Sequence, residues 1–317
     1  MDAAAVETKV GIVMNHRIFV CENSIEGILT GVYEAWTAAK EIGHSHCKLE
    51  TKMPRYALGG TEQKNAMENT SQESTCRNFE LFSEYYEVEP DAEKSRKVTR
   101  TVCDRLGMYT YQEICKAIAA EAPDLLYGGN KSEKIDKGDA VYKTIVTGFS
   151  MDCGEEVMTN LVNPYVSRTF ELARRVNREI EHLLGFLRFK ELRSGVLFSR
   201  IGPENSILPM LAPHFSDRLP LENFMIYDEK RGMFVVHRAN DPKHPVSVDQ
   251  SWALIHGESP DEVAITDYSD QEEYYQELFK AFCHSITIEA RVNPKLQQQM
   301  LPLRHRAYMV EFEQRKG

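Results

Sequence analysis

Side chains capable of acid–base chemistry lie near basic residues in the second half of the sequence. His182, His214, Asp228, Arg231 and His237 each lie at or next to the end of an element predicted there. A histidine beside a carboxylate can act as a general acid or base. An arginine can bind a phosphate or a developing oxyanion. The alternative is that the histidines border a core and that Asp228 is a turn residue.

A second set of candidates shares one face of a helix. At about 100° per residue, Arg168, Arg175 and Arg178 fall on the same side of the helix that the spacing predicts over residues 164–184. His182 shares this side, and apolar residues fill the opposite arc. Such a face can contact phosphates, although a solvated helix face is the alternative.

The charge distribution is uneven along the chain. The net charge is −10, from 38 basic and 48 acidic residues, which excludes a wholly basic nucleic-acid coat. Residues 168–200 carry eight bases against four acids, and residues 291–317 carry six against two. Residues 258–278 carry eight acids and no base. The two basic segments indicate a local anion-binding footprint or, alternatively, two solvated faces.

These candidates require elements that position them. After residue 185 the apolar period changes from helical to alternating, which predicts one hairpin over residues 186–201 and another over 224–237. The sequence therefore predicts an α+β fold: a mostly helical N-terminal part, and a long amphipathic helix packed on an antiparallel sheet of about four strands. We expect residues 1–15 to be a tail, residues 16–317 to form a single domain, and residues 54–78 to be a flexible loop.

Several function classes are not indicated. The sequence lacks the GxGxxG, GxxxxGK[ST], HExxH and GxSxG motifs, and its seven cysteines form no CxxC pair. We therefore expect no cofactor and no metal, and a reduced, cytoplasmic location. No uninterrupted apolar run approaches about 18 residues, so no membrane association is expected.

Four segments recur in this order in a known family. They are ARRVNREIEHLLGFLRFKEL (173–192), GPENSILPMLAPHFSDRL (202–219), NFMIYDEKRG (223–232) and IEARVNPKLQQQMLPLRHR (288–306). Together they resemble a bacterial family of DNA metabolism or DNA repair proteins whose conserved domain has no assigned function. The resemblance extends over residues 18–312, with the conserved-domain core in residues 164–317. It implies a radical S-adenosylmethionine protein as partner and DNA or RNA as substrate or partner.

The resemblance also implies functional positions. Combined with the helix face, the implied nucleic-acid-binding residues are Arg168, Arg175, Arg178, Arg188, Arg231, Arg291, Asn293 and Arg304. Phe186 and Phe189 are candidates for base stacking. The first hypothesis is a nucleic-acid-binding accessory protein. The alternatives are a hydrolase or glycosylase-like enzyme that uses His182, His214 and Asp228, and a structural subunit without nucleic-acid contact.

Overall fold

The computed structural model describes residues 16–52, 83–121, 135–240, 251–257 and 266–312. The chain divides into two compact units where the sequence predicted one domain. Unit 1 comprises residues 1–118 and 123–173, and unit 2 comprises residues 119–122 and 174–317. The predicted tail, residues 1–15, and the predicted loop, residues 54–78, lie outside the described residues.

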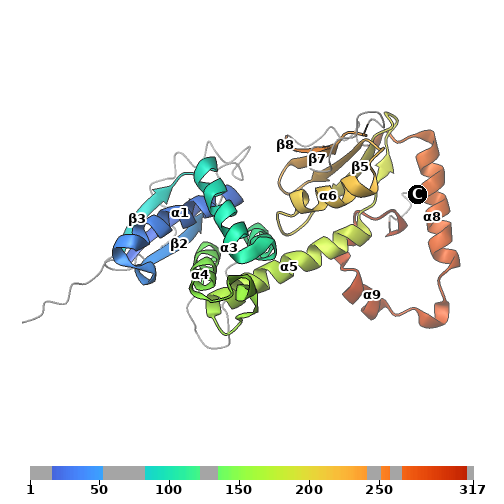
Figure 1. The fold of residues 1–317 in the computed structure, drawn as a ribbon. Coiled ribbons are helices and arrows are strands. Elements are labelled where there is room, and N and C mark those ends of the chain that lie inside the picture. Colours follow the sequence, from blue (N-terminus) through green and yellow to red (C-terminus); the bar gives the residue numbers. More distant parts are fainter. Residues whose placement is uncertain (1–15, 53–82, 122–134, 241–250, 258–265, 313–317) are drawn as a thin grey trace, which may run out of the picture. The chain divides into compact units, whose positions relative to one another are not determined.

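Unit 1 contains a parallel sheet in the strand order β2-β1-β3 (Figure 1). Its strands are β1 (His16–Glu22), β2 (Cys47–Lys52) and β3 (Ser83–Val88). Helix α1 (Ile25–Ile42) connects β1 to β2 and packs on both strands. The Ser24 side chain caps α1 by accepting a hydrogen bond from the Gly27 N–H at 3.0 Å.

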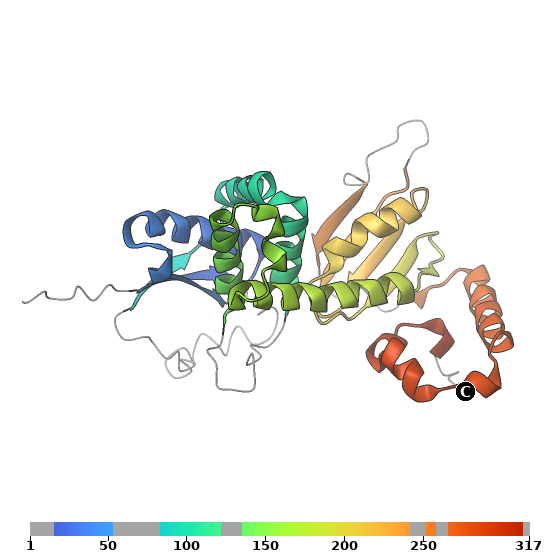
Figure 2. The same ribbon diagram turned by 60° about the horizontal axis from the view of Figure 1, so that its bottom comes forward.

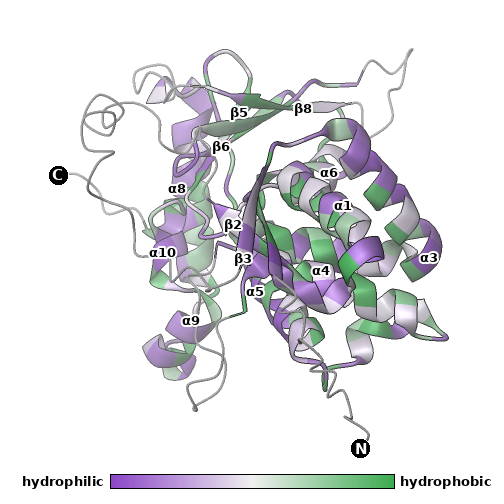
Figure 3. Ribbon diagram, turned by 90° about the vertical axis from the view of Figure 1, so that its left-hand side faces the viewer, coloured by the Kyte–Doolittle hydropathy of each residue, from purple (hydrophilic) through white to green (hydrophobic). Residues whose placement is uncertain are grey.

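Two further helices complete the core of unit 1, α3 (Ala92–Ala119) and α4 (Lys137–Ser150). Helices α1, α3 and α4 each carry both hydrophobic and hydrophilic residues, as amphipathic helices do (Figure 3). Helix α3 consists of two helical segments joined by a kink. Gly107 forms the kink between them, with φ of 81°, a backbone angle that glycine adopts without strain.

The predicted long helix is confirmed as α5 (Pro164–Phe186). Asn163 caps it, because its Oδ1 accepts the Tyr165 N–H at 2.9 Å. The first turns of α5 belong to unit 1, where Val166 and Phe170 pack with Val157 and Met158 of the 3₁₀ helix Gly154–Thr159. This half of the helix therefore packs on other helical residues, and not on a sheet as predicted.

The sheet of unit 2 has the order β4-β5-β6-β7-β8. Its strands are β4 (Lys190–Glu191), β5 (Leu197–Ile201), β6 (Phe224–Asp228), β7 (Met233–His237) and β8 (Trp252–His256). Both predicted hairpins are confirmed, since β4–β5 and β6–β7 are antiparallel. Gly232, with φ of 61°, occupies the turn of the second hairpin.

The sheet is mixed, and not wholly antiparallel as predicted, because β5 and β6 pair in parallel. Helix α6 (Leu208–Arg218) makes the crossover that a parallel pair requires, and it packs on β7 and β8 (Figure 2). The fifth strand, β8, was not predicted.

The C-terminal part of unit 2 is helical. It consists of α8 (Asp270–Ser285), the 3₁₀ helix Glu289–Arg291, α9 (Pro294–Met300), α10 (Leu303–Arg306) and the 3₁₀ helix Val310–Phe312. Helix α8 packs on the last of these. In the ranges that the structure describes, no helix is both long and apolar enough to cross a membrane.

Candidate nucleic-acid interface

The site is built on the loop that follows β5, residues 202–206. Glu179 of α5 is only 2% exposed, and its carboxylate accepts three hydrogen bonds from this loop. The Glu204 N–H donates at 2.7 Å, the Asn205 N–H at 2.9 Å, and the Asn205 Nδ2 at 2.7 Å. A buried carboxylate satisfied by three donors fixes the loop against the helix.

Arg231, in the turn between β6 and β7, holds the same loop by its carbonyl groups. Its guanidinium donates to the Pro203 carbonyl at 3.3 Å and to the Glu204 carbonyl at 2.8 Å. It also donates to Asp228 Oδ2 at 2.9 Å. Asp228 is fully buried, and burial raises the pKa of its carboxyl group although Arg231 lowers it. This pair is therefore part of the framework of the loop.

The loop presents the Glu204 side chain between two arginines. Arg304 of α10 donates from Nη1 to Glu204 Oε1 at 2.6 Å, and Arg175 of α5 approaches Glu204 Oε2 at 3.5 Å. The Arg175 and Arg304 side chains are 38% and 40% exposed. Arg178, one turn further along α5, is exposed. We call these four residues the Glu204 cluster; it carries three positive charges and one negative charge.

Two histidines lie beside the cluster. The ring of His182 on α5 is 5.7 Å from the ring of His305 and 5.9 Å from that of Phe186. His305 is buried, and its Nε2 lies 3.3 Å from Arg304 Nε, so this nitrogen accepts a hydrogen bond. Burial, together with the positive charge of Arg304 and the proximity of His182, lowers the pKa of His305 to about 4.

The His305 environment makes stability depend on pH. An unfolded histidine titrates near 6.5, so between pH 6.5 and 4 the unfolded chain binds the proton more readily and stability falls as the pH falls. We expect this residue to cost about 2 kcal/mol of unfolding free energy at pH 5 relative to pH 7. His305→Phe should remove that difference in urea titrations at the two pH values. His214→Phe, at an exposed position, should retain it; equal pH dependence in both variants would contradict the assignment.

The three candidate catalytic groups have separate surroundings. His214 lies on the exposed side of α6, where its ring contacts Phe215. Asp228 is bound to Arg231, and His182 lies against Phe186 and His305. Within the described ranges, no hydrogen bond or ion pair joins His182, His214 and Asp228.

The other residues predicted to bind nucleic acid differ in their exposure and in their partners. Arg168 was predicted on the solvent face of α5, but it is only 6% exposed, because it lies at the border of the buried arc of this helix. Arg188 pairs with Glu311 at 2.9 Å. Asn293 caps α9 by accepting the Leu296 N–H at 3.1 Å, and Arg291 is exposed two residues before it.

The candidate stacking residue Phe189 and the nearby His237 both pack against aromatic side chains of unit 2. Phe189 is half-buried and packs against the buried Phe215 and Phe224, with ring centroids 5.4 and 5.5 Å apart. His237, beside them, stacks on Phe224 and its Nδ1 lies 2.8 Å from the Glu222 carbonyl oxygen. His237 is buried, so it is a residue of the core of unit 2.

Arg188 also lines a recess on the same unit. The recess has a volume of 220 Å³, and its lining contains three basic and three aromatic residues and no acidic one. These residues are Arg188, Lys190, Arg200, Phe198, Tyr268 and Tyr308. Two of its cations have carboxylate partners just outside the lining, Glu311 for Arg188 and Glu229 for Arg200.

The family of the chain follows from its second half. Residues 136–311 match the family described as a domain of unknown function, DUF4130, and this span is more than half of the chain. The chain belongs to the DUF4130 family. The Glu204 cluster and its supporting loop lie inside the DUF4130 match. No curated protein matches the chain.

Three solved structures align with the chain at 12% identity. One is a DHH domain named as a member of a family of ribosomal proteins, with 71% of this chain and 74% of that chain covered and a TM-score of 0.29. The second is exonuclease RecJ bound to manganese (89% and 94%, TM-score 0.31). The third is RecJ in complex with Mn²⁺ from Thermus thermophilus (86% and 53%, TM-score 0.27). Similarities this low do not establish a shared fold.

Sequence reasoning missed the acidic residues that organise the DUF4130 domain. Glu179 lies at the border of the apolar arc of α5, where a buried polar residue has no signal of its own. Glu204 stands in the segment GPENS, whose glycine and proline indicate only a loop. Among the described residues, no three His, Cys, Asp or Glu side chains are grouped so that they could hold a metal ion.

Proposed function

We propose that this DUF4130 protein binds nucleic acid through phosphate groups at the Glu204 cluster. The observation that carries the proposal is that Arg175 and Arg304 converge on one carboxylate from different elements, α5 and α10, while both side chains stay about 40% exposed. Two guanidinium groups around one carboxylate leave a surplus positive charge at the surface of a chain whose net charge is −10.

The geometry suits an exchange of ligands. A guanidinium binds the oxygens of a carboxylate and those of a phosphate with the same fork of N–H donors. Exposed ion pairs contribute only about 0–1 kcal/mol, so a phosphate can displace Glu204 from Arg175 or Arg304 at little cost. Arg178, exposed one turn along α5, would contact an adjacent phosphate. Contacts of this kind position a backbone without reading its sequence.

The geometry supports binding better than hydrolysis. Asp228, the carboxylate of the alternative enzymatic hypothesis, is fully buried and its oxygen is bound to Arg231. An accessory role therefore fits the site best. The resemblance to DNA metabolism proteins favours DNA as the ligand, and a radical S-adenosylmethionine protein as the partner that performs the chemistry.

The test is a titration of single- and double-stranded oligonucleotides at several salt concentrations. The variant Arg175→Glu/Arg178→Glu should weaken binding to all sequences about equally and should reduce the salt dependence. For each phosphate group that the variant no longer binds, the slope of log K against log salt should become shallower by about 0.7–0.9. Glu204→Gln should act in the opposite direction and strengthen binding, because it removes the internal competitor for Arg175 and Arg304.

The matched control is Arg238→Glu, which reverses an exposed charge of unit 2 outside the cluster. It should change affinity less than the double variant does. Absence of binding at about 50 mM salt, with and without the partner, would refute the proposal. Weaker binding by Glu204→Gln would show that the carboxylate contributes to the complex and does not compete with it.

A further inference from the structure

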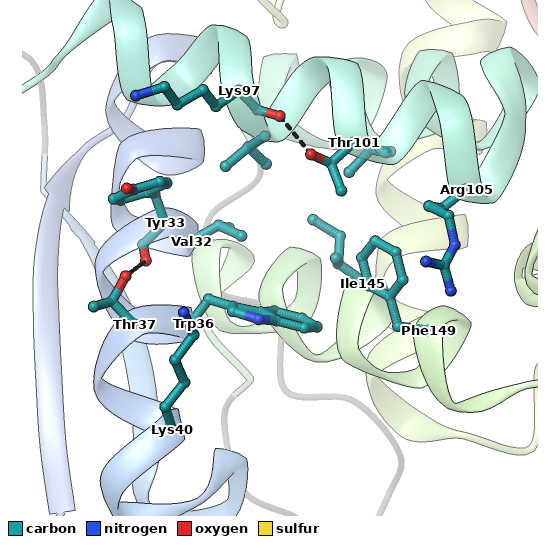
Figure 4. Close-up of a pocket in the computed structure, with 12 residues that line it drawn as sticks. Val32, Tyr33, Trp36, Thr37, Lys40, Lys97, Thr101, Arg105, Ile145 and Phe149 are labelled. Atoms are coloured by element: carbon teal, nitrogen blue, oxygen red, sulfur yellow. Dashed lines mark hydrogen bonds between the residues drawn. The ribbon is translucent and has the colours of Figure 1, made fainter.

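A pocket in unit 1 combines aromatic and basic side chains in its lining. It lies among α1, α3 and α4 and has a volume of 490 Å³, which is within the usual range of small-ligand sites (Figure 4). Its lining contains three aromatic side chains, three basic ones and no acidic one. They are Tyr33, Trp36, Phe149, Lys40, Lys97 and Arg105.

The aromatic residues form one side of the pocket. The Trp36 side chain extends from α1 toward Phe149 of α4, and the two ring centroids are 5.2 Å apart at an interplanar angle of 73° (Figure 4). Both rings are half-buried, so each is partly accessible to solvent. Buried Ile145 and Val102 provide an apolar floor between them. A planar apolar group can therefore enter and stack.

The basic residues come from two helices. Lys40 stands on α1 next to Trp36, while Arg105 on α3 lies 5.6 Å from the Phe149 ring (Figure 4). Neither has a carboxylate partner among the residues that the structure describes. Lys97 pairs with Glu93 at 2.8 Å, in an exposed pair that an anion can disrupt at little cost. The charge of the pocket is thus complementary to an anion.

From these features we propose that the pocket is a nucleotide site that takes one unstacked base of single-stranded nucleic acid together with its adjoining phosphate. The base stacks on Trp36, its adjoining phosphate binds Lys40, and the next phosphate of the strand binds Arg105 at the opposite end of the pocket (Figure 4). A neutral apolar ligand would leave the cations unused, and a simple anion would leave the aromatic wall unused. A nucleotide combines the two chemistries, as single-strand-binding surfaces do. The site belongs to unit 1 and does not depend on the Glu204 cluster of unit 2.

The test uses the fluorescence of Trp36 in the full-length chain. The sequence has two tryptophans, so Trp252→Phe leaves Trp36 as the one reporter. The probes are a thymidine octanucleotide, thymidine monophosphate, thymidine and inorganic pyrophosphate. The octanucleotide should quench Trp36 saturably and bind most tightly, while thymidine and pyrophosphate, which each lack one half of the ligand, should bind weakly or not at all.

Variants separate the two contributions. Trp36→Ala should weaken octanucleotide binding, measured by anisotropy of a labelled probe, by about 5- to 100-fold, whereas Trp36→Phe should retain most of it. Lys40→Glu/Arg105→Glu should weaken binding and lower its salt dependence. Arg96→Glu is the matched control, because Arg96 is exposed on α3 but does not line the pocket.

The outcomes distinguish this site from the Glu204 cluster. If Arg175→Glu/Arg178→Glu weakens octanucleotide binding measured by anisotropy while saturating octanucleotide still quenches Trp36, the pocket stands and the cluster proposal is separate from it. No quenching by the octanucleotide or by thymidine monophosphate overturns the pocket proposal, even if the chain still binds DNA elsewhere. Equal affinity for the monophosphate and the octanucleotide would assign the pocket to a free nucleotide and overturn the single-strand assignment.

Discussion

Replacing Glu179 with alanine is expected to lower the free energy of unfolding by about 3–5 kcal/mol. The carboxylate accepts from the N–H groups of Glu204 and Asn205 and from the Asn205 side chain. Removal of the carboxylate leaves these donors without a partner, which costs about 1–3 kcal/mol of unfolding free energy for each donor before the structure relaxes. The change should also release Glu204 from its place between Arg175 and Arg304 and thereby weaken the proposed phosphate contacts.

Urea unfolding followed by Trp252 fluorescence, in a Trp36→Phe background, measures this effect in unit 2. Glu181→Ala is the matched control, because Glu181 is exposed two residues further along the same helix and should cost no more than about 0.5 kcal/mol. Glu179→Gln should give an intermediate value, since the amide keeps one acceptor oxygen. A Glu179→Ala cost as small as that of Glu181→Ala would show that the loop is held by other contacts.

Asp228→Ala is expected to destabilise unit 2 by about 3–5 kcal/mol, because it leaves the partly buried Arg231 without its closest carboxylate. The second acidic partner of Arg231, Glu121, is 3.7 Å away. A purely catalytic Asp228 would behave differently, because its removal would affect a reaction and leave the melting temperature unchanged. Thermal melts of Asp228→Ala and Asp228→Asn therefore discriminate between the structural and the enzymatic hypotheses.

A double-mutant cycle with Arg231→Met provides the control for Asp228. If the two side chains act as a pair, the double variant should lose about 1–3 kcal/mol less than the sum of the single losses. Strict additivity would mean that Arg231 stabilises the fold only through the carbonyl groups of Pro203 and Glu204.

The long helix and the two hairpins were predictable because each depends on residues that lie close together in the sequence. Helix α5 has a capping Asn163 and a continuous apolar arc, and both hairpins have a glycine, Gly195 or Gly232, at positive φ in the turn. The parallel pairing of β5 with β6 was not predictable in this way, because it depends on the packing of α6 across the sheet. The alternation of apolar and polar residues predicts a strand, but it does not predict whether the neighbouring strand is parallel or antiparallel to it.

The candidate sites were predictable only in part. The sequence identified Arg175, Arg178 and Arg304, but the acidic residue that gathers them, Glu204, was not recognised. Arg168 was placed on the wrong side of the boundary between buried and exposed positions, which a helical wheel locates only within one residue. Trp36 was not recognised as a candidate binding residue, because nothing in its own segment indicates the lysine and arginine that α3 brings opposite it.

The parallel pair in the sheet of unit 2 has a consequence for the order in which that unit assembles. The β6–β7 hairpin can form from its own turn, since Asp228 pairs with Met233 across only a few residues. The pairing of Leu197 with Phe224 must wait until the chain has closed a loop that contains all of α6. Long-range parallel pairing is the slow step in such topologies. We therefore infer that both hairpins are early structures in folding, and that docking of α6 is the event that unites them into one sheet.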